Sequence, residues 1–431
     1  MKKVDTNILG CKVNHADVQA ILAGLNLPAD LPVGLVGTCC VTAEADKQSR
    51  KEVRRSIRRL GPGGRVFVTG CAARRDPASF SGMGGNVLAL AGLAEDAARE
   101  INAELRKSHS GQTDEDPGSS NTHPAMPVMT GPGGKVKITG PKENGRTRFF
   151  LKVQDGCSQG CAYCVIPLVR GRPRSFPLHQ VLRRAEEAVT AGYPELVVTG
   201  INVGAWRDGD ARLPQLMDRL AGTSGLKRLR LSSVEAGSVT RELLDVFRRH
   251  PVVGNHLHIP LQSGDDGVLR SMGRRHGRAG FSRAVDAARN EIPGINITTD
   301  VIVGFPSEDE ASFGNTLSFV KAAGFSKVHV FAYSARPGTK AADMGDPIPA
   351  AEKKLRSRLL RELSRSLQEK HRRRKLGRLS EVLLESAGAH GKYRGYSCDY
   401  TRFLVEGGRE GALVKVRAVA VNDEGVMGSV V

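Results

Sequence analysis

Three cysteines occupy one short loop of this chain, directly after an apolar segment that predicts a strand. The loop reads Asp155-Gly156-Cys157-Ser158-Gln159-Gly160-Cys161-Ala162-Tyr163-Cys164. Three thiolates at this spacing can bind three irons of a cubane cluster and leave the fourth iron open to a substrate. A zinc site is the alternative, but zinc prefers four ligands, and no fourth cysteine or histidine lies nearby in the sequence. The spacing therefore favours an iron–sulfur cluster at the end of a strand.

The size and charge of the chain limit its architecture and its partners. A chain of 431 residues exceeds one ordinary hydrophobic core, so we expect two or three domains. Lysine and arginine total 64 against 45 acidic residues, a formal charge of +19. Such an excess attracts polyanions, with nucleic acid as the first candidate, although a basic surface that serves only solubility is the alternative.

The cysteine content and the hydropathy indicate the compartment. Eight cysteines in a long chain argue against a disulfide framework, because cytosolic thiols stay reduced. No run approaches the ~20 apolar residues of a membrane span. Near the start, Asp5-Thr6-Asn7 stands where a signal peptide would need its apolar core. We therefore expect a cytoplasmic protein that does not cross a membrane.

Alternating apolar and amphipathic segments predict an α/β protein with three domains. Residues 1–107, which include a predicted helix over 43–60, suggest a small parallel α/β domain. Residues 108–144, rich in Gly, Ser, Pro, Thr and Asp, predict a linker. Residues 145–375 hold six strand–helix units, too few for a closed eight-stranded barrel, and predict an open partial (β/α)6 barrel. Residues 376–431 predict a small all-β barrel.

Three further cysteines, Cys11, Cys39 and Cys71, are distant in sequence but share one kind of position. Each lies in the loop just after a predicted strand. The carboxyl ends of parallel strands meet at one edge of a sheet, so these thiols are expected to converge. Gly10 and Gly70 would let the backbone approach a bulky cluster. A second cluster is one interpretation, and three unrelated buried cysteines are the other.

The first cysteine loop resembles the signature of the radical S-adenosylmethionine superfamily, C-x3-C-x-aromatic-C, with Tyr163 in the aromatic position. The resemblance implies a [4Fe–4S] cluster on Cys157, Cys161 and Cys164, whose open iron chelates S-adenosylmethionine. It also implies an electron donor, such as flavodoxin or ferredoxin. One electron then cleaves the sulfonium to a 5′-deoxyadenosyl radical, which abstracts hydrogen from an unreactive C–H bond.

Over nearly its whole length the chain resembles the methylthiotransferases of that superfamily, which carry a C-terminal RNA-binding TRAM barrel. The segments that carry the resemblance are Cys39-Cys40-Val41-Thr42-Ala43-Glu44-Ala45-Asp46, Arg170-Gly171-Arg172-Pro173-Arg174-Ser175, Thr199-Gly200-Ile201-Asn202, Leu231-Ser232-Ser233-Val234-Glu235, His258-Ile259-Pro260-Leu261-Gln262-Ser263-Gly264 and Thr299-Asp300-Val301-Ile302-Val303-Gly304-Phe305-Pro306. By this resemblance Cys11, Cys39 and Cys71 hold a second [4Fe–4S] cluster. Cys39 is favoured over its neighbour Cys40 because it follows Thr38 at the family position.

The segment Leu9-Gly10-Cys11-Lys12-Val13-Asn14 is similar to the family members that act on N6-threonylcarbamoyladenosine in tRNA. This implies transfer of a methylthio group to C2 of that adenosine, at position 37 beside the anticodon. It implies that the second cluster holds sulfur from a sulfur donor, that one S-adenosylmethionine methylates it, and that another supplies the radical. A monomer is expected.

The resemblance also places contacts to S-adenosylmethionine at strand ends. The candidates, besides Tyr163, are Gly200, Asn202, Ser232, Glu235, Gln262 and Asp300. For Glu235 and Asp300 an ion pair within the barrel is an equal alternative.

Basic and aromatic residues supply candidate RNA contacts. The arginines singled out are Arg170, Arg172, Arg174, Arg394 and Arg402. The predicted helix over 43–60 is also loaded with positive charge, and Tyr393, Tyr396, Tyr400 and Phe403 interleave with arginines in a pattern suited to base stacking. Solvated faces and core packing are the competing interpretations.

Two rival functions remain at this level. One is the same methylthiotransfer on isopentenyladenosine of tRNA or on a ribosomal-protein side chain. The other is a non-catalytic iron–sulfur protein that binds RNA or carries sulfur. The intact Cys157, Cys161 and Cys164 triad argues against the second.

Overall fold

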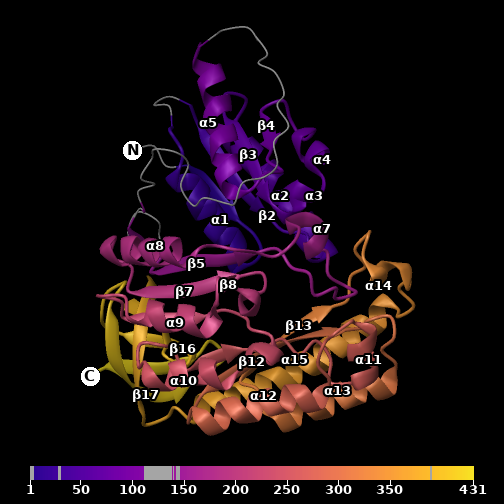
Figure 1. Ribbon diagram of the computed structural model, residues 1–431, viewed down its shortest axis with the longest axis vertical. Coiled ribbons are helices and arrows are strands. Elements are labelled where there is room, and N and C mark those ends of the chain that lie inside the picture. The colour runs from indigo at the N-terminus through magenta and orange to yellow at the C-terminus, as the bar shows by residue number, and fades with distance from the viewer. Residues whose placement is uncertain (1–3, 28–30, 111–137, 139, 142–145, 389–390) are drawn as a thin grey trace. The chain divides into compact units, whose positions relative to one another are not determined.

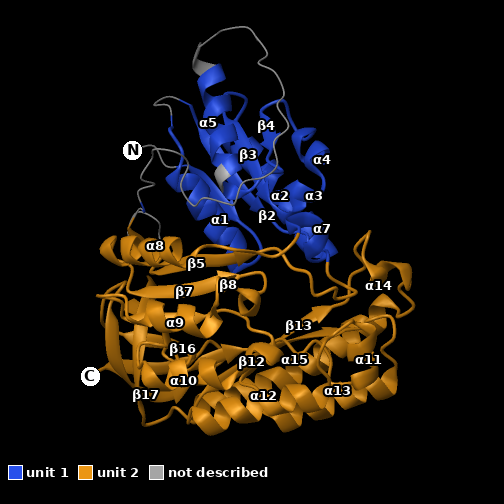
Figure 2. Ribbon diagram, viewed as in Figure 1, with its two compact units in different colours: residues 1–138, 165–171 blue, residues 139–164, 172–431 orange. Residues whose placement is uncertain are grey.

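The chain is described here from a computed structural model, which covers residues 4–27, 31–110, 138, 140–141, 146–388 and 391–431. The backbone divides into two compact units (Figure 2). Unit 1 comprises residues 1–138 and 165–171, and unit 2 comprises residues 139–164 and 172–431. The segment 165–171, which the sequence assigned to the partial barrel, therefore belongs to unit 1. Most of the linker expected at 108–144 lies outside the described residues.

Unit 1 is a four-stranded parallel sheet with helices on both faces (Figure 1). Its strands, in spatial order, are β1 (Asp5–Ile8), β2 (Val33–Thr38), β3 (Arg65–Gly70) and β4 (Val87–Ala89). Its helices are α1 (Lys12–Ala23), α2 (Ala43–Leu60), α3 (Cys71–Arg75), α4 (Pro77–Ser81), α5 (Ala94–Ser110) and α7 (Ile166–Arg170). The predicted parallel α/β domain and the bounds of α2 are confirmed.

Neighbouring residues of the central strands point to opposite faces of this sheet. Leu35 of β2 packs with Val18 of α1 and Ile101 of α5. Val36 packs with Val53 of α2 on the other face, and Val169 of α7 joins that second core. Burial on both faces explains the almost continuous apolar runs of these strands. Apolar packing thus draws the short α7 helix into unit 1.

Unit 2 contains the predicted partial barrel (Figure 1). Its six parallel strands are β5 (Arg148–Asp155), β7 (Glu195–Gly200), β10 (Arg228–Leu231), β11 (His256–His258), β12 (Asn296–Val303) and β13 (Lys327–Ala332). The helices that follow them are α8 (Leu178–Thr190), α9 (Leu213–Ala221), α10 (Arg241–Arg249), α11 (Asp266–Ser271), α12 (Arg278–Glu291), α13 (Glu310–Ala323), α14 (Lys340–Asp343) and α15 (Ala350–Arg373). Short pieces complete it: β6 (Arg174–Ser175), β8 (Arg207–Asp208), β9 (Ala211–Arg212), η1 (Val203–Ala205) and η2 (Ala236–Ser238).

The pairing of these strands leaves the barrel open. Strands β10, β7, β5 and β6 form one sheet, and β11, β12 and β13 form another. Isolated bridges join the two sheets, from Leu229 to Val253 and from Ser233 to His258. The six parallel strands therefore follow one another around a partial barrel, as the sequence predicted, with β5 and β13 as its first and last members.

A closed five-stranded barrel ends the chain, as predicted. Its strands, in spatial order, are β14 (Leu379–Ala387), β15 (Lys392–Ser397), β16 (Arg402–Glu406), β18 (Val426–Val430) and β17 (Leu413–Val421). Phe403 lies fully buried in its core with Val382 and Val416. The proposal that Phe403 stacks on RNA bases is therefore wrong, because its ring fills the barrel.

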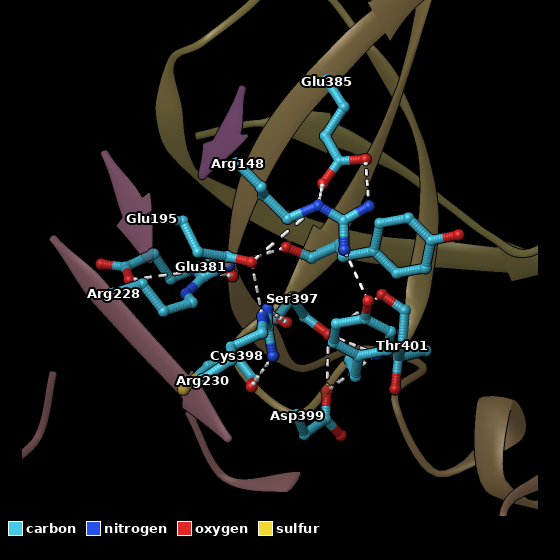
Figure 3. Close-up of polar contacts among 12 residues, drawn as sticks. Arg148, Glu195, Arg228, Arg230, Glu381, Glu385, Ser397, Cys398, Asp399 and Thr401 are labelled. Carbon is cyan, nitrogen blue, oxygen red and sulfur yellow. Dashed lines mark hydrogen bonds and ion pairs between the residues drawn. The ribbon is translucent and has the colours of Figure 1, made fainter. Parts of the chain in front are cut away.

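Buried charged residues join this C-terminal barrel to the partial barrel (Figure 3). Glu195 accepts from Arg230 Nε at 2.8 Å and from Arg228 Nη1 at 3.4 Å. The same arginines donate to backbone oxygens of the C-terminal barrel, Arg230 to Ser397 at 2.7 Å and Arg228 to Tyr396 at 3.0 Å. Because Glu195 and Arg228 are the first residues of β7 and β10, the C-terminal barrel covers the amino ends of the strands.

Among the described residues, no helix combines the length and the apolar character that a membrane span requires.

Candidate functional site

The first cysteine triad lies at the carboxyl end of β5, in unit 2. Cys157, Cys161 and Cys164 are all partly exposed. The loop is held in place by backbone bonds, since Ala162 N donates to Met272 O at 2.9 Å and Ala162 O accepts from Ala341 N at 2.8 Å. The position matches the end of a β/α barrel that carries active sites. The three thiols are thus presented on one braced loop.

Arg274 contacts this triad from the segment after α11. Its Nη1 lies 3.6 Å from Cys161 Sγ and 3.2 Å from Glu235 Oε1, and its Nη2 donates to Pro260 O at 3.1 Å. Burial alone would lower the pKa of Arg274, but Tyr163, Glu235 and Cys161 together raise it above its ordinary value. The guanidinium is therefore a permanent cation beside a cysteine ligand.

A cavity of about 230 Å³ opens beside this arginine. Cys161 and Gln159 of the cysteine loop line it together with Glu235, Arg274 and His276. It offers room for a small polar ligand next to the cysteine loop.

The other strand-end candidates gather at the same end of the partial barrel. Gly200 ends β7, and Asn202 N donates to Gln154 Oε1 at 2.7 Å. Ser232 follows β10, and its Oγ is buried without a hydrogen-bond partner among the described residues. Because buried hydroxyls are normally paired, this orphaned oxygen fits a bound ligand such as S-adenosylmethionine.

Gln262 is held in a conformation that costs energy. Its φ of 75° lies in the left-handed region, which non-glycine residues rarely adopt. Its backbone is fixed to β12, since Gln262 N donates to Asp300 O at 2.8 Å and its O accepts from Ile302 N at 2.9 Å. Such strain persists where surrounding bonds impose it, often at functional sites.

Glu235 and Asp300 have partners within the barrel. Glu235 pairs with Arg274, and Asp300 Oδ2 lies 3.1 Å from His258 Nε2. His258 Nδ1 is 2.9 Å from Thr298 Oγ1, which fixes the ring. The ion-pair interpretation is therefore correct for Glu235, both of whose carboxylate oxygens contact Arg274, and Asp300 has a histidine partner within the barrel.

The second triad lies at the carboxyl ends of β1, β2 and β3, in unit 1. Cys11 caps the start of α1 and is exposed, while Cys39 and Cys71 are buried. Cys71 is the first residue of α3 rather than the loop residue that the sequence suggested, because α3 begins directly after β3. Burial, together with the charges of the neighbouring Cys71 and Cys11, raises the pKa of Cys39 to about 11. The three thiols therefore converge.

Two glycines permit this convergence. Gly10 has φ +95°, and a Cβ there would lie 2.9 Å from Cys39 Cβ. Gly70 has φ +97°, and a Cβ would lie 2.4 Å from Thr38 O. Any side chain at either position would push the strand ends apart.

The geometry bears on the choice between a cluster and a single ion. Among the described residues, the three-residue group whose ligand atoms all lie within 4.8 Å of one another is His258, Asp300 and His329. Neither cysteine triad is gathered that tightly. Ligands around one zinc ion would be close neighbours, whereas cubane ligands bind separate irons. The two triads are therefore not gathered around a single ion, and their all-thiolate chemistry suits two [4Fe–4S] clusters.

Arg170 corrects an expectation from the sequence. Its side chain is fully buried in unit 1, where Nε lies 3.2 Å from Cys71 Sγ. One Nη2 contact reaches Asn14 Oδ1 at 2.8 Å, and another reaches Asp17 Oδ2 at 3.0 Å. A guanidinium in these surroundings does not fit the expected RNA contact, because no part of it is open to a phosphate.

The other four arginines singled out for RNA remain at the surface. Arg172 and Arg394 are exposed. Arg174 lies 3.8 Å from Asp155 Oδ2, and Arg402 lies 3.7 Å from Glu424 Oε2. By contrast, Tyr400 and Tyr396 pack beside Arg148 at the junction of the two barrels, which favours their packing interpretation.

Comparison with known proteins identifies the family. The radical SAM superfamily profile matches residues 151–320, and "Uncharacterized protein family UPF0004" matches residues 3–92. The threonylcarbamoyladenosine tRNA methylthiotransferase MtaB of Thermotoga maritima is 34% identical over 438 residues, covering 99% of this chain and 96% of its own. The chain belongs to the radical S-adenosylmethionine methylthiotransferase family. Its cofactors are S-adenosylmethionine and two [4Fe–4S] clusters.

Other relatives of this methylthiotransferase support the same family. The MtaB of Bacillus subtilis is 34% identical and covers 97% of this chain and 94% of its own. The tRNA-2-methylthio-N(6)-dimethylallyladenosine synthase of Cereibacter sphaeroides is 37% identical over 65% of this chain and 64% of its own. The radical S-adenosylmethionine methyltransferase TsrM of Kitasatospora setae shares the fold, with a TM-score of 0.53 and 14% identity over 76% of this chain and 66% of its own.

Sequence reasoning missed two residues of this methylthiotransferase that touch cysteine ligands. Arg274 lies in a basic run that resembles solvated surface charge, and Arg170 lies in another. A usable signal was present in α1, where Asn14 and Asp17 stand three residues apart among apolar neighbours. Polar residues on the inner face of a helix indicate a buried hydrogen-bonding partner, because burying them unpaired costs free energy.

Proposed function

We propose that this methylthiotransferase adds a methylthio group to C2 of N6-threonylcarbamoyladenosine at position 37 of tRNA. The observation that carries the proposal is the nearly full-length likeness to relatives named for that nucleoside, which spans both cysteine triads and the C-terminal barrel. C2 of adenine has a strong C–H bond and no acidic or nucleophilic handle. General acid–base residues offer no route to it, so radical chemistry suits the task.

Each triad has its own part in the proposal. Cys157, Cys161 and Cys164 would hold the cluster that binds S-adenosylmethionine, and Cys11, Cys39 and Cys71 would hold the auxiliary cluster that carries sulfur. When bound, these groups supply the radical and the methylthio sulfur. The chain's own residues bind, orient and shield them.

The strand ends of the partial barrel would orient S-adenosylmethionine. The proposed contacts are Tyr163, Gly200, Asn202, Ser232, Glu235, Gln262 and Asp300. Ser232 Oγ is the firmest of these, because it is buried and unpaired among the described residues. Half-buried Tyr163, which packs against Met272 and Phe305, would exclude water beside the cysteine loop.

The tRNA would be held by exposed cations on both units. We propose the C-terminal barrel's Arg394 and Arg402, the post-loop Arg172 and Arg174, and the exposed face of α2. A net charge of +19 favours attraction to phosphate. We further propose that the enzyme works in the cytoplasm as a monomer, with a flavodoxin or ferredoxin as reductant and a separate sulfur donor.

Nucleoside mass spectrometry tests this function most directly. Deleting the gene should abolish 2-methylthio-N6-threonylcarbamoyladenosine and leave the unthiolated nucleoside in its place. Purified enzyme with reduced clusters should restore the modification on tRNA from the deletion strain. Methylthiolation of isopentenyladenosine instead would overturn the substrate assignment.

A second substrate candidate rests on a specific likeness. The dimethylallyladenosine enzyme of Cereibacter sphaeroides is the more identical relative where it matches, at 37%, but it matches only 65% of this chain. Competition between the two modified tRNAs for one purified enzyme distinguishes the candidates. The longer likeness favours threonylcarbamoyladenosine.

A further inference from the structure

We propose that Arg170 is a positioning residue for the auxiliary cluster, which fixes Cys71 as a ligand and raises the reduction potential of that cluster. The inference rests on the proposed assignment of Cys11, Cys39 and Cys71 to the cluster. It concerns a buried cation that the family likeness did not assign to this site.

The burial of Arg170 requires a reason within unit 1. A buried guanidinium is costly unless it is paired and hydrogen-bonded. The Asp17 carboxylate, also buried, lies 3.0 Å from Nη2 and supplies the opposite charge. Nη2 also donates to Asn14 Oδ1 at 2.8 Å, and Nε lies 3.2 Å from Cys71 Sγ. The Cys71 sulfur is thus one of the acceptors that compensate the buried Arg170 guanidinium.

Asn14 extends the same network to the other two ligands. Its Nδ2 donates to Leu9 O at 2.9 Å and to Thr38 O at 2.7 Å. Leu9 lies two residues before Cys11, and Thr38 directly precedes Cys39. One arginine and one asparagine therefore connect all three strand ends that carry the cysteines.

The electrostatic consequence follows from the charge of the cluster. Reduction adds a negative charge to a site that already holds three thiolates. A hydrogen bond to a ligand sulfur, and a cation in a low-dielectric interior, stabilise the reduced state more than the oxidised state. The Arg170 charge, with Nε 3.2 Å from Cys71 Sγ, should therefore ease reduction of the cluster.

A purely structural role is the competing explanation, because Arg170 ends α7 and could merely fasten that helix to unit 1. The two roles predict changes in different measured quantities. A structural role changes the thermal stability of unit 1 and leaves the potential of a bound cluster unchanged. The chain also offers a control, since Arg274 of unit 2 has a buried side chain that pairs with Glu235.

The experiment uses the full-length chain with Cys157, Cys161 and Cys164 replaced by alanine, so that only the auxiliary cluster remains. After anaerobic reconstitution, iron content and a redox titration followed by electron paramagnetic resonance are measured for the parent, R170K and R170M. We expect R170M to lower the equilibrium constant for reduction about tenfold, which is ~59 mV for one electron. R170K, which keeps the charge but not the planar fork, should fall between.

The control is R274K in the same background. Its auxiliary cluster should have the same midpoint reduction potential as that of the parent. Iron loss in R170M with an unchanged circular-dichroism melt would support the positioning role. The midpoint potential of the auxiliary cluster would then be measured on R170K. Full iron with an unshifted midpoint in R170M would overturn the proposal. So would iron loss together with unfolding of unit 1, because Arg170 would then serve the fold alone. A parent that binds no auxiliary cluster would instead refute the proposed function.

Discussion

Cys39 and Cys40 are neighbours in the chain but lie in different surroundings. Cys40 is fully buried in the apolar core with Val36 and Val53. Cys39 lies against the strand end that carries Cys11, and its backbone is fixed by Ser49, whose Oγ accepts from Cys39 N at 3.0 Å and donates to Cys39 O at 3.1 Å. The surroundings therefore favour Cys39 as the ligand.

We predict that C39A loses about half of the iron that the reconstituted protein binds, because one of two equal clusters loses a ligand. C40A should keep its iron and lose only the packing of one small buried side chain. Iron and sulfide analysis after anaerobic reconstitution checks both variants. Retained iron in C39A with lost iron in C40A would reverse the assignment.

Asp399 illustrates how a single buried carboxylate couples the C-terminal barrel to pH. Burial would raise its pKa, but the His371 hydrogen bond, the Lys375 charge and the Ser397 hydroxyl hold the pKa far below its ordinary value. A carboxylate whose pKa is depressed by folding stabilises the protein above the unfolded value of ~3.9, and that stability is lost as the pH falls.

D399N should therefore destabilise unit 2 at pH 7 by on the order of 1.5–3 kcal/mol, the cost of losing hydrogen bonds to a charged group. The difference from wild type should stay constant above pH 5 and shrink below about pH 4. The chain's one tryptophan, Trp206, is fully buried in unit 2, so urea unfolding followed by its fluorescence is the measurement. If the difference in free energy of unfolding between D399N and wild type does not change with pH, Asp399 does not contribute to the pH dependence of stability.

At the level of elements, apolar periodicity was enough to predict the long segments. Helix α2 and the six barrel strands follow from spacing alone, and the strand-end positions of the cysteines follow from parallel topology. Helix α7 was placed in the wrong unit, since its packing against Val53 depends on residues a hundred positions away.

The candidate site was predictable only in part, for a related reason. The first triad was predicted from the spacing of its cysteines, and the second from the position of each cysteine directly after a predicted strand. Arg170 was predicted to contact RNA, because nothing local in the sequence distinguishes a buried arginine from an exposed one. Its meaning depends on Asp17, which lies more than 150 residues earlier.

Helix α2 presents a stripe of cations that a functional tRNA surface would use. Lys47, Lys51, Arg54 and Arg58 are exposed and spaced by four, three and four residues, opposite the buried face that contains Val53. Residues at that spacing lie on one face of a helix. A solvated face with no ligand is the alternative.

R54E/R58E should weaken tRNA binding and reduce the slope of log Kd against log salt by roughly 0.7–0.9 for each phosphate that the helix no longer neutralises. The matched control is R283E/K321E, which reverses two exposed charges on α12 and α13 of unit 2. Filter binding from low to moderate salt compares the two pairs. Equal losses of affinity in both would mean that only net charge matters.

For the whole molecule, the strands of unit 2 have different roles at their two ends: the carboxyl ends carry the cysteine loop, and the amino ends contact the C-terminal barrel. The cysteine loop follows the carboxyl end of β5, while Arg148 at its amino end pairs with Glu385 of the C-terminal barrel at 2.7 Å. Eight residues of strand place these ends roughly 23 Å apart at ~3.3 Å per residue. The C-terminal barrel is therefore part of the support for the strands. Removing it would expose Glu195 and its arginines, which are buried as an ion-pair group.

Truncation at Leu379 is consequently a poor test of RNA binding. It removes Glu385 and the carbonyl acceptors of Arg228 and Arg230, so it destabilises unit 2 whether or not the barrel binds RNA. R394Q/R402Q is the sharper test. Arg394 is exposed, and Arg402 makes a surface ion pair of 3.7 Å with Glu424, so their loss should change stability by no more than about 1 kcal/mol. We expect weaker tRNA binding with a shallower salt dependence, and unchanged reductive cleavage of S-adenosylmethionine in the absence of tRNA, since the cysteine loop lies at the opposite ends of the strands. Trp206 fluorescence confirms that unit 2 is folded in the variant. Wild-type tRNA affinity in that folded variant would show that the C-terminal barrel serves the fold and that the tRNA is held elsewhere.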